Sequence, residues 1–239
     1  MSILSVNKLG RLSLGFPMLD DVFTGFELGD FVVIRGNAAS FMSSVLSVRA
    51  QLPIGCGGLD SSTVFVDGGN SFSPYEVAET ARDYGLACKA ALDKVYVSRA
   101  FTAYQLSSLV LDRVCPVLRK KRARLLIVSD VVPLFLDRDI PKMEGRELFM
   151  RVCSKLSEIA SEKQTVVIVS YFPRSRSGQS LFFEAALFGK SNVLIKLKRN
   201  RRVMSVILED HPCIRPFRMD FTADQQRDHA RAYGGASLG

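Results

Sequence analysis

The fold is decided by one stretch of sequence, Phe31-Val-Val-Ile-Arg-Gly-Asn-Ala-Ala-Ser-Phe-Met-Ser-Ser44. A short apolar run that meets a glycine and continues into an apolar helical pattern is typical of a strand, a turn and a helix. In this context the motif G-x-x-x-x-G-K-[ST] binds phosphate, because the loop N–H groups surround the anion, the lysine neutralises it and the hydroxyl holds Mg²⁺. Aligned on Gly36, the motif finds Phe41 in place of its second glycine and Met42 in place of its lysine. Ser43 alone fills its role, so the stretch predicts the scaffold of a phosphate loop without most of its chemistry.

Apolar runs of strand length recur along the chain and alternate with amphipathic helical patterns. We expect strands at Phe31–Arg35, Thr63–Val66, Lys94–Val97, Leu125–Val128, Thr165–Ser170, Val193–Leu197 and Val203–Leu208. We expect helices at Met42–Leu52, Pro74–Tyr84, Tyr104–Leu118 and Arg146–Glu162. Near-continuous apolar strands with helical crossovers predict an α/β fold with a mostly parallel central sheet, in which 31–35, 63–66, 125–128 and 165–170 are buried neighbours. The last two strands flank a basic turn and predict a C-terminal antiparallel hairpin.

The composition is that of a folded intracellular protein. Of the 239 residues, 47% are apolar, which is enough to build a substantial core. The length and the absence of a linker predict a single domain over residues 1–222, and a polar tail over 223–239 that we expect to fray. No apolar run approaches the roughly 18–20 residues of a membrane helix, and residues 1–10 carry no signal-peptide pattern. We therefore expect a cytoplasmic protein with no membrane partner.

Cysteine and histidine usage excludes several chemistries. The five cysteines never stand in C-x-x-C spacing, so we interpret them as reduced thiols rather than disulfides or metal ligands. The only histidines are His211 and His229. A histidine-based zinc site or a Ser-His-Asp triad is therefore not expected, and we predict no metal site.

Five collinear segments resemble the core of the RecA/RadA/KaiC-type ATPases, and of the RadA-type recombinases in particular. The segments are the entry Leu14–Asp20 with Gly25–Asp30 and the phosphate-loop stretch, then Val64–Tyr75, Ser98–Gln105, Leu125–Asp130 and Val166–Tyr171. The resemblance spans about Leu12 to Phe221. It implies a RecA-like core, a mostly parallel sheet flanked by helices, and an ancestry in ATP and Mg²⁺ chemistry.

The departures from these relatives all fall on catalytic positions. The catalytic Glu position holds Gly69, the Walker B Asp position holds Ser129 followed by Asp130, and the Gln after the 166–169 strand is Tyr171. Asp130 does not automatically replace an aspartate at 129, because one step along a strand reverses the side chain. Losing the lysine, the base and the metal-holding carboxylate together should abolish phosphoryl transfer. We expect no catalytic residue and no cofactor. Vestigial nucleotide-binding positions, at which ATP with Mg²⁺ would sit in an alternative interpretation, are Gly36, Ser43, Ser44 and Asp130.

Lysine and arginine outnumber aspartate and glutamate by 32 to 24, and their clustering suggests nucleic acid as a partner. Arg174 and Arg176 stand where the resemblance places a DNA-binding loop. Five further cations crowd the turn of the predicted hairpin: Lys196, Lys198, Arg199, Arg201 and Arg202. No aromatic residue is interleaved among them, with Phe172 nearest on another loop, so we expect contacts to phosphate without base stacking. Plain solubility is the alternative for the hairpin. The basic run 119–124 is interpreted as a solvated helix end.

Three functions from different classes remain open. The first is a non-catalytic RadA/RecA-like paralog that acts as a DNA-binding or assembly factor in DNA repair or recombination. Its partners would be single- or double-stranded DNA, a RadA-like recombinase or another repair protein, or a second copy of itself, and it would associate with the nucleoid. The second is a KaiC-like pseudo-ATPase scaffold that docks a partner protein without contacting DNA. The third is a nucleotide-binding protein with residual ATPase activity despite its degenerate Walker A motif.

Overall fold

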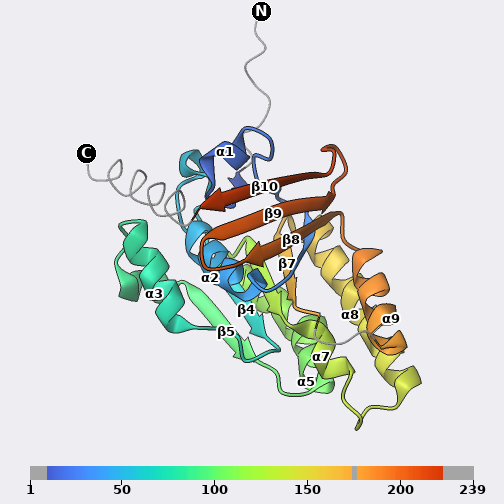
Figure 1. Cartoon of the computed structure of the whole chain (residues 1–239). Coiled ribbons are helices and arrows are strands. Elements are labelled where there is room, and N and C mark those ends of the chain that lie inside the picture. Colours follow the sequence, from blue (N-terminus) through green and yellow to red (C-terminus); the bar gives the residue numbers. More distant parts are fainter. Residues whose placement is uncertain (1–9, 174–176, 223–239) are drawn as a thin grey trace, which may run out of the picture.

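The computed structural model of the chain, which describes residues 10–173 and 177–222, is built on an eight-stranded sheet with helices on both faces (Figure 1). The strand order is β10-β9-β8-β3-β7-β6-β4-β5. Its strands are β3 (Phe31–Arg35), β4 (Thr63–Asp67), β5 (Val95–Arg99), β6 (Leu125–Ser129), β7 (Val166–Tyr171), β8 (Val193–Arg199), β9 (Val203–Asp210) and β10 (Phe217–Thr222). A separate antiparallel pair joins β1 (Arg11–Leu12) to β2 (Phe26–Glu27). The polar tail predicted over 223–239 lies outside the described residues.

The helices form two layers. One face of the sheet carries α2 (Ala39–Arg49), α3 (Pro74–Asp83) and α4 (Cys88–Asp93), with α1 (Pro17–Asp20) packed on the same core. The other face carries α5 (Ala103–Ser108), α6 (Val114–Lys121), α7 (Val131–Phe135), α8 (Lys142–Lys163) and α9 (Gly178–Phe188). Short turns of other helix types lie at Ile54–Cys56 and Leu109–Arg113. Within the described ranges, no helix combines the length and the apolar character needed to cross a bilayer.

The predicted α/β architecture is confirmed. Strands β8, β3, β7, β6, β4 and β5 pair in parallel, while β9 and β10 run antiparallel at one edge. The four strands expected to be buried neighbours, β3, β7, β6 and β4, are adjacent in the sheet. Every residue of β4, β6 and β7 is buried, as expected for strands covered by helices on both faces.

Several boundaries differ from the sequence prediction for physical reasons. The helix expected at 104–118 runs from 103 to 121 and contains a π-helical turn at Leu109–Arg113. The strand expected at 94–97 is shifted to Val95–Arg99, because Lys94 caps the short helix α4. The expected strands and helices include neither α4 nor β10. Helix α4 is too short for a clear period. In β10, apolar and polar residues alternate from Phe217 to Thr222, which is the pattern of a half-buried strand, so the sequence carried a signal that the prediction missed.

The turn after β3 depends on a glycine. Gly36 has φ +113, and a Cβ at this position would lie 2.0 Å from the carbonyl oxygen of Leu197 in β8. The backbone of the neighbouring strand therefore occupies the space of any side chain. Only glycine combines the left-handed conformation with this close approach.

We predict that Gly36→Ala lowers the free energy of unfolding by at least about 2 kcal/mol, because it adds an unfavourable φ and a clash with backbone. Gly178→Ala is the matched control, since a Cβ there would meet nothing within 4 Å. Urea unfolding followed by circular dichroism measures both variants. Equal stabilities for the two variants would contradict the close approach of β8 to the loop.

Candidate functional site

The loop between β3 and α2 is bonded to the chain's own hairpin. The Asn37 side chain forms two hydrogen bonds with the backbone of Arg199, donating from Nδ2 to the carbonyl oxygen (2.8 Å) and accepting the Arg199 N–H at Oδ1 (2.8 Å). On the other side of the loop, the Gly36 N–H donates to the carbonyl oxygen of Tyr171 (3.1 Å). The loop is thus held between the ends of β7 and β8.

Aromatic and apolar groups fill the positions where the motif has its second glycine and its lysine. The guanidinium of Arg199 lies 4.5 Å from the centroid of the Phe41 ring, in a cation–π contact. Met42 is fully buried in the core beneath the sheet. Arg199 of the hairpin therefore stacks on the loop residue Phe41, at the place where a phosphate loop would surround an anion. The next residue is Met42 and not a lysine.

The two vestigial serines of α2 are engaged within the helix layer. Ser43 is buried, and its hydroxyl donates to the carbonyl oxygen of Ala39 (3.0 Å). The Ser44 hydroxyl donates to Glu76 of α3 (2.9 Å). Each hydroxyl thus donates to a group of the protein, Ser43 to its own helix and Ser44 to α3.

A buried carboxylate to which no sequence motif points organises the carboxyl ends of β4 and β6. Asp67 is fully buried and accepts hydrogen bonds from the Ser129 hydroxyl (2.9 Å) and the Ser71 N–H (2.9 Å). Its second oxygen lies 3.3 Å from Nε of Arg99. The available signal was an aspartate at the end of an apolar strand, directly before two glycines. Ser129 therefore acts as a neutral donor at the Walker B position.

The side chain of Asp130 fills the space that a side chain on Gly69 would need. Asp130 leaves β6 in the left-handed conformation, with φ 51. A Cβ on Gly69 would lie 2.4 Å from the Cβ of Asp130 and 2.7 Å from its Oδ2. The Asp130 carboxylate also accepts the N–H of Phe172 (3.4 Å). A glutamate at 69 is thus incompatible with Asp130 as it stands.

Tyr171, at the position of the relatives' glutamine, is part of the core. Its hydroxyl donates to Glu184 of α9 (2.9 Å). Burial is the main cause that raises the pKa of Tyr171 to about 12, so the phenol stays protonated and remains a donor at neutral pH.

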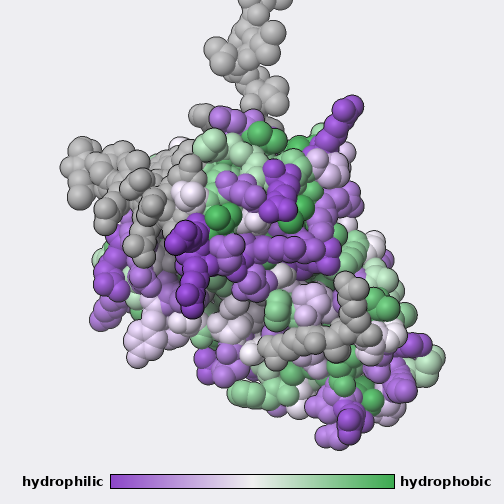
Figure 2. Space-filling model, viewed as in Figure 1, coloured by the Kyte–Doolittle hydropathy of each residue, from purple (hydrophilic) through white to green (hydrophobic). Residues whose placement is uncertain are grey.

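A basic cavity of about 810 Å³ opens next to the loop. It is lined by Arg35, Gly36, Asn37, Phe172, Pro173, Lys196, Lys198, Arg199, Asn200, Ser205 and Arg218. Both arginines that stand beside it on β3 and β10 are neutralised. Arg35 donates twice to Glu209, at 2.6 Å each, and Arg218 lies 3.1 Å from the carboxylate of Asp220. Hydrophilic side chains gather over β8 to β10 in Figure 2.

The predicted hairpin cluster is divided between surfaces. Lys196 and Lys198 line the cavity from one face of β8, and Arg199, which also lines it, packs over Phe41 of α2. Arg201 and Arg202 are exposed in the turn between β8 and β9. The division follows from strand alternation, which sends successive side chains to opposite faces. Arg174 and Arg176 lie outside the described residues.

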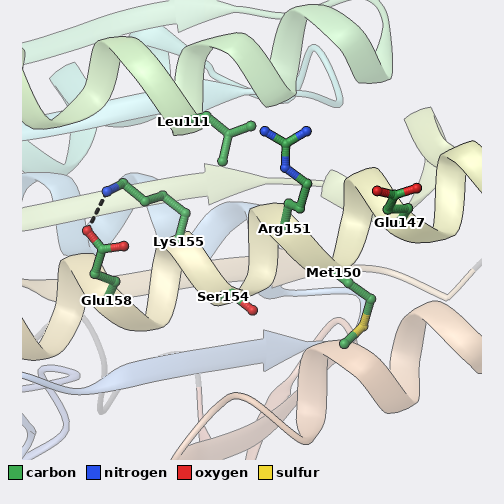
Figure 3. A pocket seen from close by; sticks show the side chains of 7 residues that line it. All are labelled: Leu111, Glu147, Met150, Arg151, Ser154, Lys155 and Glu158. Carbon is green, nitrogen blue, oxygen red and sulfur yellow. Dashed lines mark hydrogen bonds and ion pairs between the residues drawn. The ribbon is translucent and has the colours of Figure 1, made fainter.

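A second hollow, of about 420 Å³, runs along α8 beside the π-helical turn (Figure 3). Its lining includes Arg151 and Lys155, and also Glu147 and Glu158, of which Lys155 and Glu158 form an ion pair. The two positive and two negative groups offset each other, so this hollow offers no net attraction to a polyanion. Over the described ranges, no three His, Cys, Asp or Glu side chains come together as ligands for one metal ion.

The fold and the loop define a RecA-type core, and the comparisons identify its family. The Rad51 family model matches residues 11–186, so the chain belongs to the Rad51 family, and the resemblance to recombinase-type proteins is confirmed. The chain is also similar to the DNA repair protein RAD51 of Mycosarcoma maydis, with 29% identity over 134 residues. That match covers 54% of this chain and 39% of the length of the relative.

We predict that Ser129→Asp lowers the free energy of unfolding by about 3 kcal/mol or more near neutral pH, because it places a second carboxylate against buried Asp67. Like charges in one buried site raise the pKa of one carboxyl in the folded state above its unfolded value. The loss of stability caused by Ser129→Asp is therefore greatest above that raised pKa, and it becomes smaller as the pH falls through that pKa. Urea unfolding at about pH 7.5 and about pH 5 measures the difference.

Ser129→Ala is the control for this substitution, because it removes the donor without adding charge and should cost about 1–3 kcal/mol. If both variants lose the same stability at both pH values, charge repulsion at Asp67 is not the reason for a serine at this position.

Proposed function

We propose that this protein is a non-hydrolysing member of the Rad51 family that acts as a nucleic-acid-binding or assembly factor in DNA repair or recombination. The observation that carries the proposal is the closure of the phosphate loop by the chain's own hairpin, through Asn37, Phe41 and Arg199. A loop in this state presents a cation–π contact where its relatives wrap a phosphate. The name of the similar fungal protein, a DNA repair protein, supports the biological setting.

Hydrolysis of ATP requires groups that neutralise the phosphate charge and a base that positions the attacking water, and the residues at both positions lack these groups. Met42 is buried and carries no charge. The base position is Gly69, and the adjoining space contains the carboxylate of Asp130. These features support a protein that binds partners rather than one that turns over nucleotide.

We predict that the purified protein releases phosphate from ATP no faster than background, with or without DNA. Met42→Lys alone should not restore turnover, because Arg199 still stacks on Phe41 and Gly69 supplies no general base. A sensitive phosphate-release assay measures both proteins. Turnover in the natural sequence that disappears in Ser43→Ala would contradict the proposal and favour a rearranged nucleotide site.

The cations of the hairpin support nucleic acid as one partner. Lys196, Lys198, Arg201 and Arg202 all lie on or next to one two-stranded segment, and clustered cations of this kind suit a phosphate backbone. A RadA-like recombinase, another repair protein or a second copy of the chain would be the protein partner of an assembly factor.

We predict that Arg201→Glu/Arg202→Glu weakens binding to single-stranded DNA. The slope of log affinity against log salt concentration should become shallower by about 0.7 for each phosphate that the variant no longer neutralises. Both residues are exposed in the turn, so the fold should be unaffected. The matched control is Arg119→Glu/Lys120→Glu, which makes the same charge change at the end of α6, before the amino end of β6. Filter binding across a salt series measures all three proteins. Equal effects in both variants would mean a diffuse attraction to the whole basic surface.

A second candidate function, a protein scaffold that does not contact DNA, is favoured by a separate observation. Phe101, two residues before α5, and Met143, at the beginning of α8, are 69% and 74% exposed. These two helix ends are joined by a hydrogen bond from the Tyr104 hydroxyl to Glu144 (2.9 Å). Exposed apolar side chains on joined helix ends suit a partner protein. Absence of DNA binding at low salt would leave this candidate as the better one.

A further inference from the structure

The basic cavity lies beside the closed loop and on the opposite side of β8 from the core beneath α2. Ile195 and Leu197 point into that core, so the alternating Lys196 and Lys198 point to the other face, where the cavity is. The cavity also borders Gly36 at the carboxyl end of β3. In open α/β sheets, ligands bind outside the carboxyl ends of the strands. Closure of the phosphate loop therefore leaves a hollow at this edge of the sheet.

Among the described residues, the cavity's positive charge that is not paired with a carboxylate lies on two lysines and on Arg199, whose guanidinium stacks on Phe41. The arginines of β3 and β10 that line the cavity already bind carboxylates. Within residues 10–173 and 177–222, neither Lys196 nor Lys198 forms an ion pair. Two residues apart on one strand, they leave the sheet about 7 Å from each other, close enough for both flexible side chains to reach one phosphate group.

An aromatic ring shares this cavity. Phe172 is 44% exposed and follows β7 directly. Its backbone is fixed by the hydrogen bond to Asp130 and by the proline that follows. The sequence predicts phosphate contacts without stacking, because no aromatic residue stands among the hairpin cations. The structure brings Phe172 and the two lysines into one hollow through the pairing of β7, β3 and β8.

We propose that the cavity binds one unpaired nucleotide unit, with its base against Phe172 and its phosphate between Lys196 and Lys198. A volume of about 810 Å³ is within the range of small-ligand pockets, roughly 300–1,000 Å³. A base in a duplex is paired and stacked on its neighbours, so its face is not available to the ring. The unit belongs either to a single strand, in which case this inference rests on the proposed function, or to a free nucleotide.

The test uses a single-stranded oligonucleotide containing 2-aminopurine, whose fluorescence falls when the base stacks. We expect Phe172→Leu to weaken single-strand binding about tenfold or more and to abolish the fluorescence change, with the salt slope unchanged. Phe172→Tyr should retain both the single-strand affinity and the fluorescence change. Lys196→Gln/Lys198→Gln should weaken binding and reduce the salt slope, whereas the control Lys89→Gln/Lys94→Gln on and after α4 should not. Binding of a duplex should not respond to Phe172→Leu.

The outcomes separate this site from the proposed function. Single-strand binding that depends on Arg201 and Arg202 but ignores Phe172→Leu would keep the proposed function and overturn the cavity site. Binding of dAMP that requires Phe172 and the two lysines, without retention of any oligonucleotide, would keep the cavity as a free-nucleotide site and overturn the nucleic-acid function. Failure of both ligands to bind would overturn both. Circular dichroism of each variant confirms that the fold is retained.

Discussion

The contact between Gly36 and the backbone of β8 constrains everything at the carboxyl edge of the sheet. Because the Leu197 carbonyl occupies the space of a Cβ on Gly36, the loop after β3 and the end of β8 form one closely packed unit. The two hydrogen bonds from Asn37 to Arg199 extend this unit by two residues. Once β8 is fixed here, alternation places Arg199 over the loop and its neighbouring lysines on the far face. Loop closure and the basic cavity are therefore two consequences of one strand pairing.

Ser129 and Gly69 are each matched to a neighbouring carboxylate. Ser129 donates to a buried carboxylate, so an aspartate there would meet a like charge. Gly69 leaves room for the carboxylate of Asp130, which in turn accepts the N–H that begins the next loop. An aspartate at 129 or a glutamate at 69 would therefore each meet a neighbouring carboxylate that fits the present residue.

The sequence predicts the centre of the sheet well, because strands covered on both faces are continuous apolar runs and parallel strands need helical crossovers. It predicts the phosphate-loop scaffold for the same reason. It fails for features that depend on contacts between distant segments. The stacking of Arg199 on Phe41 joins residues from two ends of the fold, and the approach of Phe172 to Lys196 requires the pairing of three strands. The role of Asp67 depends on a donor from another strand.

The distribution of basic side chains shows why position matters more than net charge. At the amino end of the sheet, Lys121 lies 4.1 Å from the centroid of the Tyr96 ring, and its neighbours complement the carboxyl terminus of α6. At the carboxyl end, Arg35 is neutralised by Glu209, and the lysines of β8 have no such carboxylate among the described residues. A parallel sheet gathers the ends of β3, β7 and β8 at this edge whether or not the loop retains its chemistry. Uncompensated charge at that edge is therefore the part of the basic surface that a phosphate ligand can use.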